Sequence, residues 1–436
     1  MYIVYSLLLA CALLVSLPWW LFQLVRLGKY RAGLAERLGF VPPRLRAQIK
    51  SGSIWIHAVS VGEVLAVSRL ITELQAANPH TPVFVSTTTA TGQKLARERF
   101  GDSQVFYAPL DFGFAVRAYL HVLKPTLLVL AETEFWPNLL RRSREGGAAL
   151  AIVNARVSDR SFPRYSRFRW FFARVLAGVD LFLAQTKDDA ARLRAIGAPA
   201  ERVEVSGNLK FDVRDSAGSP LQESLRQAIG KGSRVIVCGS TSEGEEQMLL
   251  AAFAQILKAY PSAVMVLAPR HPERFDAVAR LVSESGLPLL RRSTWSQPTQ
   301  PGPALAPVGG SVFLLDSIGE LASVYALADV AFVGGSLLPG TGGHNILEPA
   351  QHGVPILVGP NTFNFREIVK IFEHGSALAV VSESNLAQQL NRLLADPAAR
   401  QKMGARAREL FVENSGATAR TLHALESLLR RRALKV

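Results

Sequence analysis

Cysteine is almost absent from this chain of 436 residues, which contains only Cys11 and Cys238. A disulfide framework needs several cysteine pairs, and a cysteine-based metal site needs three or four thiolates, so both are excluded. Histidine clusters and paired aspartates with the spacing of metal ligands are also missing. The composition therefore favours a reaction that needs no metal ion, in a reducing compartment.

Charge is missing altogether from residues 1–25, which are apolar and long enough to cross a bilayer as a helix that Pro18 kinks near its end. Aromatic side chains follow where an interfacial belt belongs, and basic residues come next: Trp19, Trp20 and Phe22, then Arg26, Lys29, Arg31 and Arg37. This order predicts an uncleaved anchor, with the remainder of the chain on the cytoplasmic side of the membrane. A cleaved secretory signal is disfavoured because no basic segment precedes the apolar run.

Acidic residues are scarce relative to basic ones: 35 Asp and Glu against 49 Lys and Arg give a net charge of +14. Nucleic acid, anionic lipid and phosphorylated small molecules would all suit such a surface. Arginines alternate with aromatic residues in one region, a mixture typical of nucleic-acid binding and of helices on anionic membranes. The residues are Arg156, Arg160, Arg164, Arg167, Arg169 and Arg174, with Phe162, Tyr165, Phe168, Trp170, Phe171 and Phe172. The predicted anchor favours the membrane; a basic helix with its aromatic face turned inward is the other alternative.

Short apolar runs alternate with amphipathic stretches along the rest of the chain, as in parallel sheets covered by helices on both faces. The predicted strands form two series, separated by a segment rich in glycine, serine and proline. The first series is Ile54–Val59, Pro82–Thr87, Pro125–Ala131, Ala148–Val153 and Leu181–Gln185, and the second is Val235–Cys238, Ala263–Leu267, Val312–Leu315, Val330–Val333 and Pro355–Val358.

We therefore predict an α/β protein of GT-B type, in which two Rossmann-like doubly wound domains face each other across a cleft, plus the N-terminal transmembrane helix. The length also exceeds what one core comfortably holds. The predicted boundaries are 1–25 for the anchor, 26–210 for the first domain, 211–230 for the linker, 231–415 for the second domain, and 416–436 for a closing helix with a basic tail.

The stretch 334–350 is the most informative part of the second domain. An apolar run ends in two glycines, a glycine-rich loop follows, and a short helix is expected from Asn345. Glycines let backbone N–H groups approach a phosphate, and a helix N-terminus adds donors. Asn345 and Glu348 would share one side of the first turn, where the carboxylate could accept ribose hydroxyls. A nucleotide-sugar site is thus predicted, with Gly335 and Ser336 as candidate phosphate contacts. An ordinary turn in which Glu348 caps its helix is the alternative.

Other polar residues follow predicted strands at their carboxyl ends, where ligands of such sheets gather. Glu63 could deprotonate a sugar hydroxyl, or merely complement a helix dipole in the first turn. Arg270 suits phosphate binding, and Ser240 is a further candidate phosphate contact. Ser60, Glu132 and Glu134 are candidate acceptor-site residues.

Six segments, in order, resemble 3-deoxy-D-manno-octulosonic acid (Kdo) transferases, the glycosyltransferases that add Kdo to the lipid A precursor. The segments are residues 57–63, 87–92, 132–138, 207–212, 269–272 and 334–350. The likeness covers nearly the whole chain, including the N-terminal segment. It implies a GT-B fold and inverting transfer without a cofactor, from CMP-Kdo to lipid IVA, in lipopolysaccharide biosynthesis. It also implies a single-pass protein of the bacterial inner membrane, with its catalytic domains on the cytoplasmic side.

The resemblance also implies roles for individual residues. Glu63 would be the general base that deprotonates the acceptor. The positions that match CMP-binding residues of the family are Pro269, Arg270, Ile318, Gly319, Glu320, Asn345, Ile346, Leu347 and Glu348. The implied partners are CMP-Kdo, lipid IVA and inner-membrane lipids, and not nucleic acid. Three alternatives stay open: a GT-B enzyme that uses another nucleotide sugar on a membrane lipid, a nucleic-acid-binding protein, which would explain the charge, and a membrane-anchored two-lobed binding protein.

Overall fold

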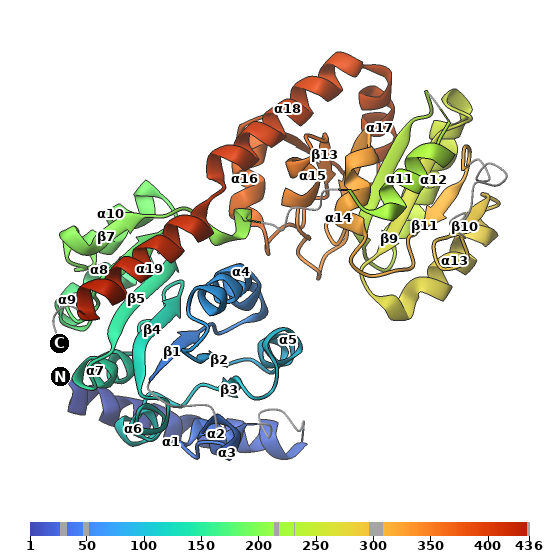
Figure 1. The fold of residues 1–436 in the computed structure, drawn as a ribbon. Coiled ribbons are helices and arrows are strands. Elements are labelled where there is room, and N and C mark those ends of the chain that lie inside the picture. Colours follow the sequence, from blue (N-terminus) through green and yellow to red (C-terminus); the bar gives the residue numbers. More distant parts are fainter. Residues whose placement is uncertain (27–32, 47–51, 213–217, 231, 296–307, 434–436) are drawn as a thin grey trace. The chain divides into compact units, whose positions relative to one another are not determined.

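A computed structural model describes residues 1–26, 33–46, 52–212, 218–230, 232–295 and 308–433. The chain divides into two compact units. The N-terminal unit comprises Met1–Asp212 and Ser415–Val436, and the C-terminal unit comprises Val213–Asn414. Each is built on one seven-stranded parallel sheet with helices on both faces, so the prediction of two doubly wound domains is confirmed (Figure 1). Residues 213–217 of the predicted linker, and Lys29 and Arg31 of the basic flank, lie outside the described residues.

The sheet of the N-terminal unit has the strand order β3-β2-β1-β4-β5-β6-β7. Its strands are β1 (Ser53–His57), β2 (Val83–Thr87), β3 (Val105–Tyr107), β4 (Pro125–Ala131), β5 (Ala149–Ala155), β6 (Leu181–Ala184) and β7 (Val203–Val205). Its helices are α1 (Tyr2–Arg26), α2 (Leu34–Arg37), α3 (Pro43–Arg46), α4 (Val61–Ala77), α5 (Ala90–Phe100), α6 (Gly113–Leu123), α7 (Pro137–Glu145), α8 (Phe162–Arg167), α9 (Arg169–Leu176), α10 (Lys187–Ala195) and α19 (Ala417–Ala433). All five strands predicted for this half are present.

Both faces of this sheet are buried, because side chains alternate between the faces along each strand. On β1, Trp55 packs into one core with residues of α6, α7, α9 and α10. Its neighbours Ile54 and Ile56 pack into the other core with α4, α5 and α19. Helices therefore cover both faces, which explains why the central strands read as continuous apolar runs.

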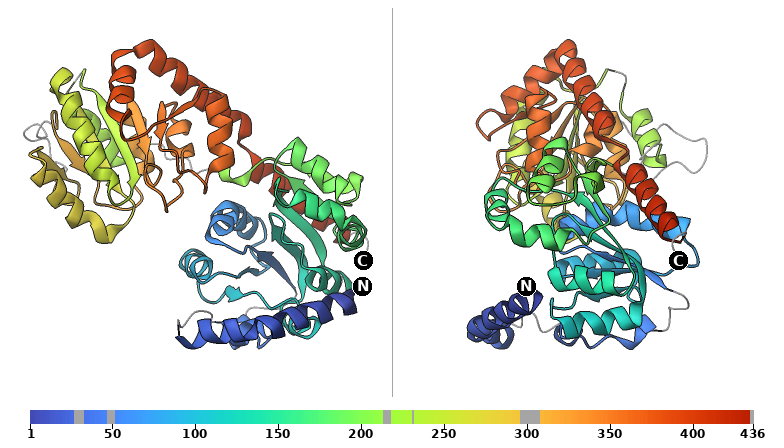
Figure 2. Two further views of the ribbon diagram at one scale, coloured as in Figure 1. Left: turned by 180° about the vertical axis from the view of Figure 1, so that it is seen from behind. Right: turned by 90° about the vertical axis from the view of Figure 1, so that its left-hand side faces the viewer.

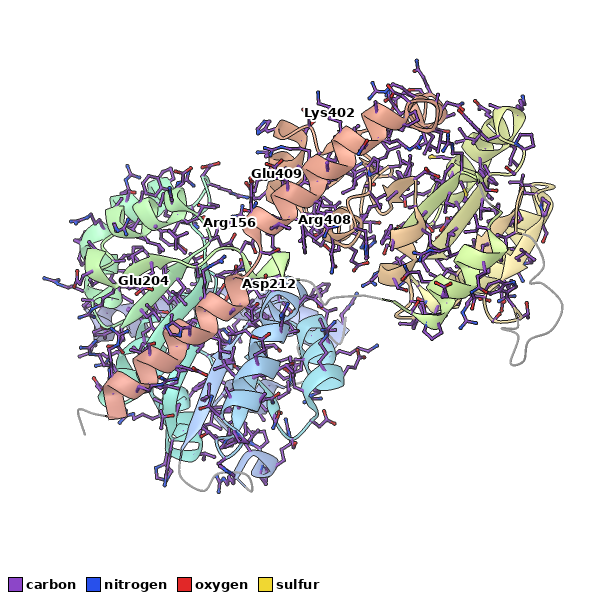
Figure 3. The ribbon with its side chains drawn as sticks, turned by 45° about the horizontal axis from the view of Figure 1, so that its top comes forward. Arg156, Glu204, Asp212, Lys402, Arg408 and Glu409 are labelled. Atoms are coloured by element: carbon purple, nitrogen blue, oxygen red, sulfur yellow. The ribbon has the colours of Figure 1, made fainter. Side chains whose placement is uncertain are left out.

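The C-terminal unit repeats this plan, with the strand order β10-β11-β9-β8-β12-β13-β14. Its strands are β8 (Val235–Thr241), β9 (Val264–Pro269), β10 (Leu289–Arg291), β11 (Val312–Leu314), β12 (Val330–Val333), β13 (Ile356–Val358) and β14 (Leu378–Val380). Its helices are α11 (Pro220–Ala228), α12 (Glu245–Ala259), α13 (Phe275–Glu284), α14 (Leu321–Val324), α15 (Leu347–Gln351), α16 (Arg366–His374), α17 (Leu386–Ala395) and α18 (Pro397–Asn414). Helices α12, α13 and α17 bury one face, and α11 and α14 the other. Lys402, Arg408 and Glu409 extend from α18 (Figure 3).

The last helix, α19, returns to the N-terminal unit and packs against α4 and β5 (Figure 2). Its start is held by Asp212, whose carboxylate accepts hydrogen bonds from the backbone N–H groups of Gly416, at 2.6 Å, and Thr418. Arg420 donates to the carbonyl oxygen of Ser206 at 2.8 Å. The two points at which the chain leaves and re-enters this unit are therefore tied together, close to Asp212 in Figure 3.

Within the described part of the chain, one helix has the length and composition to cross a membrane. It is the stretch Tyr2–Trp20 of α1, with a mean hydropathy of 2.0 and none of it buried. The first turns of α1 contact the N-terminal unit: the Ser6 hydroxyl accepts a hydrogen bond from Asn138 Nδ2 at 3.0 Å, and the Arg141 guanidinium lies over the ring of Tyr2.

Candidate functional site

Polar residues gather where the strand order reverses in the N-terminal unit. From β1 the chain continues to β2 on one side, and from the neighbouring β4 it continues to β5 on the other side. Ligands of doubly wound sheets bind outside the carboxyl ends of two such strands. Glu63 lies in the first turn of α4, six residues after the end of β1, and Glu132 directly follows β4. The predicted base and the predicted acceptor residues are thus brought together at this edge.

The Glu63 side chain is only 8% exposed. Its Oε2 accepts a hydrogen bond from the Val59 amide at 2.8 Å, and its Oε1 accepts one from the Ser60 hydroxyl at 2.9 Å. Burial raises the pKa of Glu63 to about 7, and the negative charges of Glu132 and Glu134 add to that increase, while the two hydrogen bonds oppose it. The alternative role, in which Glu63 only complements the helix dipole, is compatible with this position. Each carboxylate oxygen nevertheless keeps a second lone pair that could accept a proton from a ligand.

The backbone of Glu132 is strained, with a φ of 56° in the left-handed region that residues other than glycine rarely adopt. This conformation turns the chain sharply at the end of β4. Burial raises the pKa of the neighbouring Glu134, and the charge of Glu132 contributes to the same increase. The cation in this group is Lys210, whose Nζ lies 3.8 Å from Glu132 Oε1.

A second group forms in the C-terminal unit, again around a reversal of strand order, here between β8 and β12. Arg270 directly follows β9, and its positive charge lowers the pKa of Glu348, although burial outweighs this and raises that pKa. Asn345 Nδ2 donates to Glu348 Oε1 at 3.3 Å, while Asn345 Oδ1 accepts from the Leu347 amide at 3.1 Å. The structure therefore unites Arg270, Asn345 and Glu348, with Ile346 and Leu347 buried between the last two.

The remaining predicted donor residues occupy different surroundings. Pro269 is the last residue of β9, and Ser240 sits near the end of β8 with a strained φ of 54°. Ile318 is 79% exposed, and Gly319 has a φ of 90°. Glu320 forms an ion pair with Arg292, whose Nε lies 3.0 Å from Glu320 Oε2.

The amides of Gly335 and Ser336 are already engaged. Both donate hydrogen bonds to the buried carboxylate of Glu245, at 2.7 and 2.9 Å. A donor phosphate could bind these two amides only by displacing the Glu245 carboxylate. The role of Gly335 and Ser336 as phosphate contacts stays a prediction.

The sequence analysis missed two residues: Lys210, which belongs to the group in the N-terminal unit, and His344, which belongs to the group in the C-terminal unit. The predicted boundaries make Lys210 the last residue of the first domain, with no role in the site. In the structure, Asn154 Oδ1 accepts a hydrogen bond from the Leu209 amide at 3.0 Å, and the adjacent Lys210 lies close to Glu132. His344 lies beside Gly335, and its Nε2 is buried without a hydrogen-bond partner among the described residues. Burial, reinforced by the charges of Arg270 and His271, lowers the pKa of His344 to about 4. The spacing of three residues that pairs Asn345 with Glu348 could have revealed neither Lys210 nor His344.

The arginine-rich aromatic region divides into two parts. One part packs against the core of the N-terminal unit, as expected for a basic helix with its aromatic face turned inward; it consists of Phe162, Tyr165, Phe171 and Phe172. Phe168 and Trp170 instead expose 47% and 62% of their surface. Aromatic rings exposed among arginines are what binding at an anionic membrane surface needs. Among the described residues, no group of three or more His, Cys, Asp or Glu side chains could hold a metal ion, and the predicted metal independence stays a prediction.

Comparison with known proteins decides the family. Residues 32–213 match the family model of 3-deoxy-D-manno-octulosonic-acid transferase (kdotransferase), and residues 306–410 match that of glycosyl transferases group 1. The chain is 35% identical over 417 residues to the 3-deoxy-D-manno-octulosonic acid transferase of Haemophilus influenzae, covering 93% of this chain and 94% of that protein. The chain belongs to the Kdo transferase family. The corresponding transferase of Bordetella pertussis is 37% identical over 429 residues, covering 95% and 97% of the two chains.

The fold of this Kdo transferase family member has counterparts among solved structures. The Staphylococcus aureus MnaA–UDP structure matches with a TM-score of 0.52 at 16% identity, covering 87% of this chain and 97% of that one. At this identity the match concerns the fold alone, and it agrees with the predicted GT-B class. The Kdo transferase model ends at residue 213, next to the last residue of the first part of the N-terminal unit.

Proposed function

We propose that the protein transfers Kdo from CMP-Kdo to lipid IVA with inversion and without a metal ion, in lipopolysaccharide biosynthesis. The observation that carries the proposal is Glu63, a buried carboxyl with a pKa of about 7 among the acidic residues at the reversal of strand order, in a member of the Kdo transferase family. A general base works best with a pKa near the operating pH, and burial provides that here.

The proposed step uses one proton transfer and one substitution. The Glu63 carboxylate takes the proton of the acceptor's primary hydroxyl, and the oxygen forms a bond to the anomeric carbon of Kdo. The bond from that carbon to the phosphate oxygen breaks, and CMP leaves with the electron pair. Attack opposite the leaving group inverts the configuration. Ser60, Glu132 and Glu134 would position the acceptor, with Lys210 as the adjacent cation.

The donor would bind in the C-terminal unit. Arg270 supplies a cation for the leaving phosphate, a role that matters because no metal ion would neutralise it. Glu348, half-buried beside Asn345, would accept the ribose hydroxyls. The other proposed CMP contacts are Pro269, Ile318, Gly319, Glu320, Ile346 and Leu347.

Replacing Arg270 with alanine should weaken CMP binding by about 10- to 100-fold, since charge-assisted hydrogen bonds to phosphate are worth about 1.5–3 kcal/mol each. Isothermal titration of CMP into the full chain measures this directly. Arg280→Ala, which removes an exposed arginine of α13, is the matched control. An Arg270→Ala protein that binds CMP like the unmodified chain would reject the assignment.

Incubation with CMP-Kdo and lipid IVA, followed by mass analysis of the lipid, tests the whole proposal. We expect a mass increase of one or more Kdo residues, and the same spectrum counts the additions. A parallel reaction with UDP-sugars tests the alternative donor class. Product from a UDP-sugar and none from CMP-Kdo would overturn the donor assignment.

We further propose that α1 anchors the protein as a single-pass helix in the inner membrane, with both units in the cytoplasm. A helix of 25 residues is about 37 Å long at 1.5 Å per residue, enough to cross the hydrocarbon core. Spanning in this orientation requires the contacts of Tyr2 and Ser6 to be released, because the start of α1 would lie on the far side of the bilayer.

Deleting residues 2–25 should move most of the protein from the membrane to the soluble fraction, while turnover of detergent-dispersed lipid IVA persists. Fractionation with membranes as complete as that of the intact chain would show that the anchor is unnecessary. A cysteine introduced by Ile3→Cys in a Cys11→Ser chain should react with a membrane-impermeant maleimide in intact cells. Protection of that thiol would favour a helix lying on the cytoplasmic face.

A further inference from the structure

Two adjacent glutamates at the start of α12 are completely buried, and the proposed reaction uses neither. Glu245 and Glu246 are both 0% exposed, whereas Glu243 in the preceding turn is exposed. Burying a carboxylate is costly unless hydrogen bonds replace its water, so each of these side chains must be satisfied by specific partners.

Glu245 is satisfied almost entirely by the glycine-rich loop. Its Oε1 accepts from the amides of Ser336, at 2.9 Å, and Leu337, at 2.8 Å. Its Oε2 accepts from the amides of Gly335, at 2.7 Å, and Ser242, at 2.8 Å. Three successive backbone N–H groups that converge in this way form an anion-binding concavity. The chain's own carboxylate fills it.

The close fit of this contact depends on glycine. A Cβ atom on Gly334 would lie 2.9 Å from Glu245 Oε2 and 2.6 Å from the carbonyl oxygen of Ser240. The loop then continues from Leu337 to Asn345 and Glu348, the proposed ribose-binding residues. The position of Glu245 therefore fixes the start of the segment that carries them.

Glu246 holds the other half of the proposed donor site. Its Oε1 accepts from the Thr241 hydroxyl at 2.8 Å and from Arg274 Nη1 at 2.7 Å, and its Oε2 accepts from Arg274 Nη2 at 3.0 Å. Arg274 is the last residue of the short segment that follows β9, and Arg270 is the first residue of that segment. The Arg270 amide in turn donates to the Thr241 carbonyl oxygen at 3.0 Å.

We propose that Glu245 and Glu246 are positioning residues for the nucleotide donor: Glu245 holds the loop that leads to Asn345 and Glu348, and Glu246 holds the segment with Arg270. The inference rests on the proposed donor site and changes one part of it. The amides of Gly335, Ser336 and Leu337 bind the Glu245 carboxylate and not the donor phosphate, whose charge is met by Arg270.

The test is CMP titration into the full chain carrying Glu245→Ala. We expect CMP affinity to fall about 100-fold, because Asn345 and Glu348 would each lose a hydrogen bond to the ribose, at about tenfold apiece. Sodium formate should restore much of the affinity, because a small carboxylate refills the empty concavity, whereas sodium chloride at equal ionic strength should not. A residue that merely stabilised the fold would give no such carboxylate-specific recovery at a temperature where both proteins are folded.

Glu243→Gln, a change in the exposed glutamate of the same turn, is the matched control and should bind CMP normally. Glu246→Gln, which weakens the ion pair with Arg274, should lower the affinity about tenfold. If Glu245→Ala does not fold, Glu245→Gln replaces it: the amide keeps one accepting oxygen, and we expect affinity at least about tenfold lower.

Three results separate failure of this inference from failure of the proposed function. An unmodified chain that does not bind CMP would overturn the proposed donor and this inference with it. Normal CMP affinity in the Glu245 variants, combined with weak binding by Arg270→Ala, would overturn the positioning role alone. Loss of affinity that formate and chloride restore equally, or that neither restores, would also overturn it.

Discussion

Glu63→Gln should reduce the turnover of Kdo transfer by about 10²- to 10⁴-fold, the usual contribution of a general base. Glutamine keeps the size of the side chain and an oxygen that can accept the Ser60 or Val59 hydrogen bond, but it takes up no proton at neutral pH. CMP affinity should stay unchanged, because the proposed CMP contacts lie in the C-terminal unit. Single-turnover kinetics with radiolabelled CMP-Kdo and titration of CMP measure the two quantities separately.

Glu98→Gln, on the exposed side of α5, is the matched control for this substitution and should leave turnover unchanged. Substantial residual turnover in Glu63→Gln would remove Glu63 as the base. Loss of turnover together with loss of CMP affinity would instead indicate damage beyond the proton transfer, which the position of Glu63 in the N-terminal unit does not predict.

The pH dependence gives the same assignment an independent check. Glu63 must be deprotonated to act as a base, so turnover should fall as the pH drops below about 7, the pKa that burial gives it. The raised pKa of Glu63 affects the stability of the fold in the opposite direction: stability falls as the pH rises. The folded state holds the proton more tightly than the unfolded state, so the stabilisation is complete below the unfolded pKa of 4.5 and is lost as the pH rises through 7.

Glu63→Gln removes this dependence and should therefore be more stable than the unmodified chain at pH 8, by at most about 3.5 kcal/mol, at about 1.4 kcal/mol for each pKa unit. Thermal unfolding at pH 8 and pH 5 provides the comparison. A charged carboxylate kept in a buried place at a cost in stability is what a functional site requires and a simple helix cap does not.

The sequence predicted the interior of both sheets and missed their edges. The strands β4 and β12 have the predicted bounds, and the other predicted strands differ by a few residues at their ends. The four strands that were missed, β3, β7, β10 and β14, are the outermost strands of the two sheets and contain three residues each. A strand buried between two neighbours must be apolar throughout, whereas a short edge strand is too brief to show a period and can be partly exposed.

The same distinction applies to the candidate site. Glu63 and Arg270 were predicted because each follows an apolar strand at its carboxyl end, which is a local signal. Glu245 gives no such signal. It lies 90 residues from Gly335 in sequence, and only the adjacency of β8 and β12 makes the carboxylate fill the concavity of the glycine loop. Contacts that depend on sheet order cannot be read from neighbouring residues.

Truncation after Asn414 should unfold the N-terminal unit, although it removes only the end of the chain. Ala417 and Leu425 of α19 are fully buried, and Leu428 nearly so, in the core that also contains Ile54 and Ile56 of β1. Burial of each large apolar side chain contributes about 1.5–3 kcal/mol, and loss of the helix would also expose the sheet face beneath it. The loss approaches the entire stability of a typical domain, about 5–15 kcal/mol.

Asp212 makes the expected effect larger, because its carboxylate would lose the amides of Gly416 and Thr418. Limited proteolysis of the truncated chain should digest the N-terminal unit and leave residues 213–414 resistant and able to bind CMP. The point substitution Leu425→Ala should destabilise the N-terminal unit by about 2–5 kcal/mol in a thermal melt, whereas His423→Ala on the exposed side of α19 should have little effect. Protection of the N-terminal unit from protease without α19 would mean that its sheet closes its core alone. The return of the chain from the C-terminal unit would then serve to link the two units and not to complete the first.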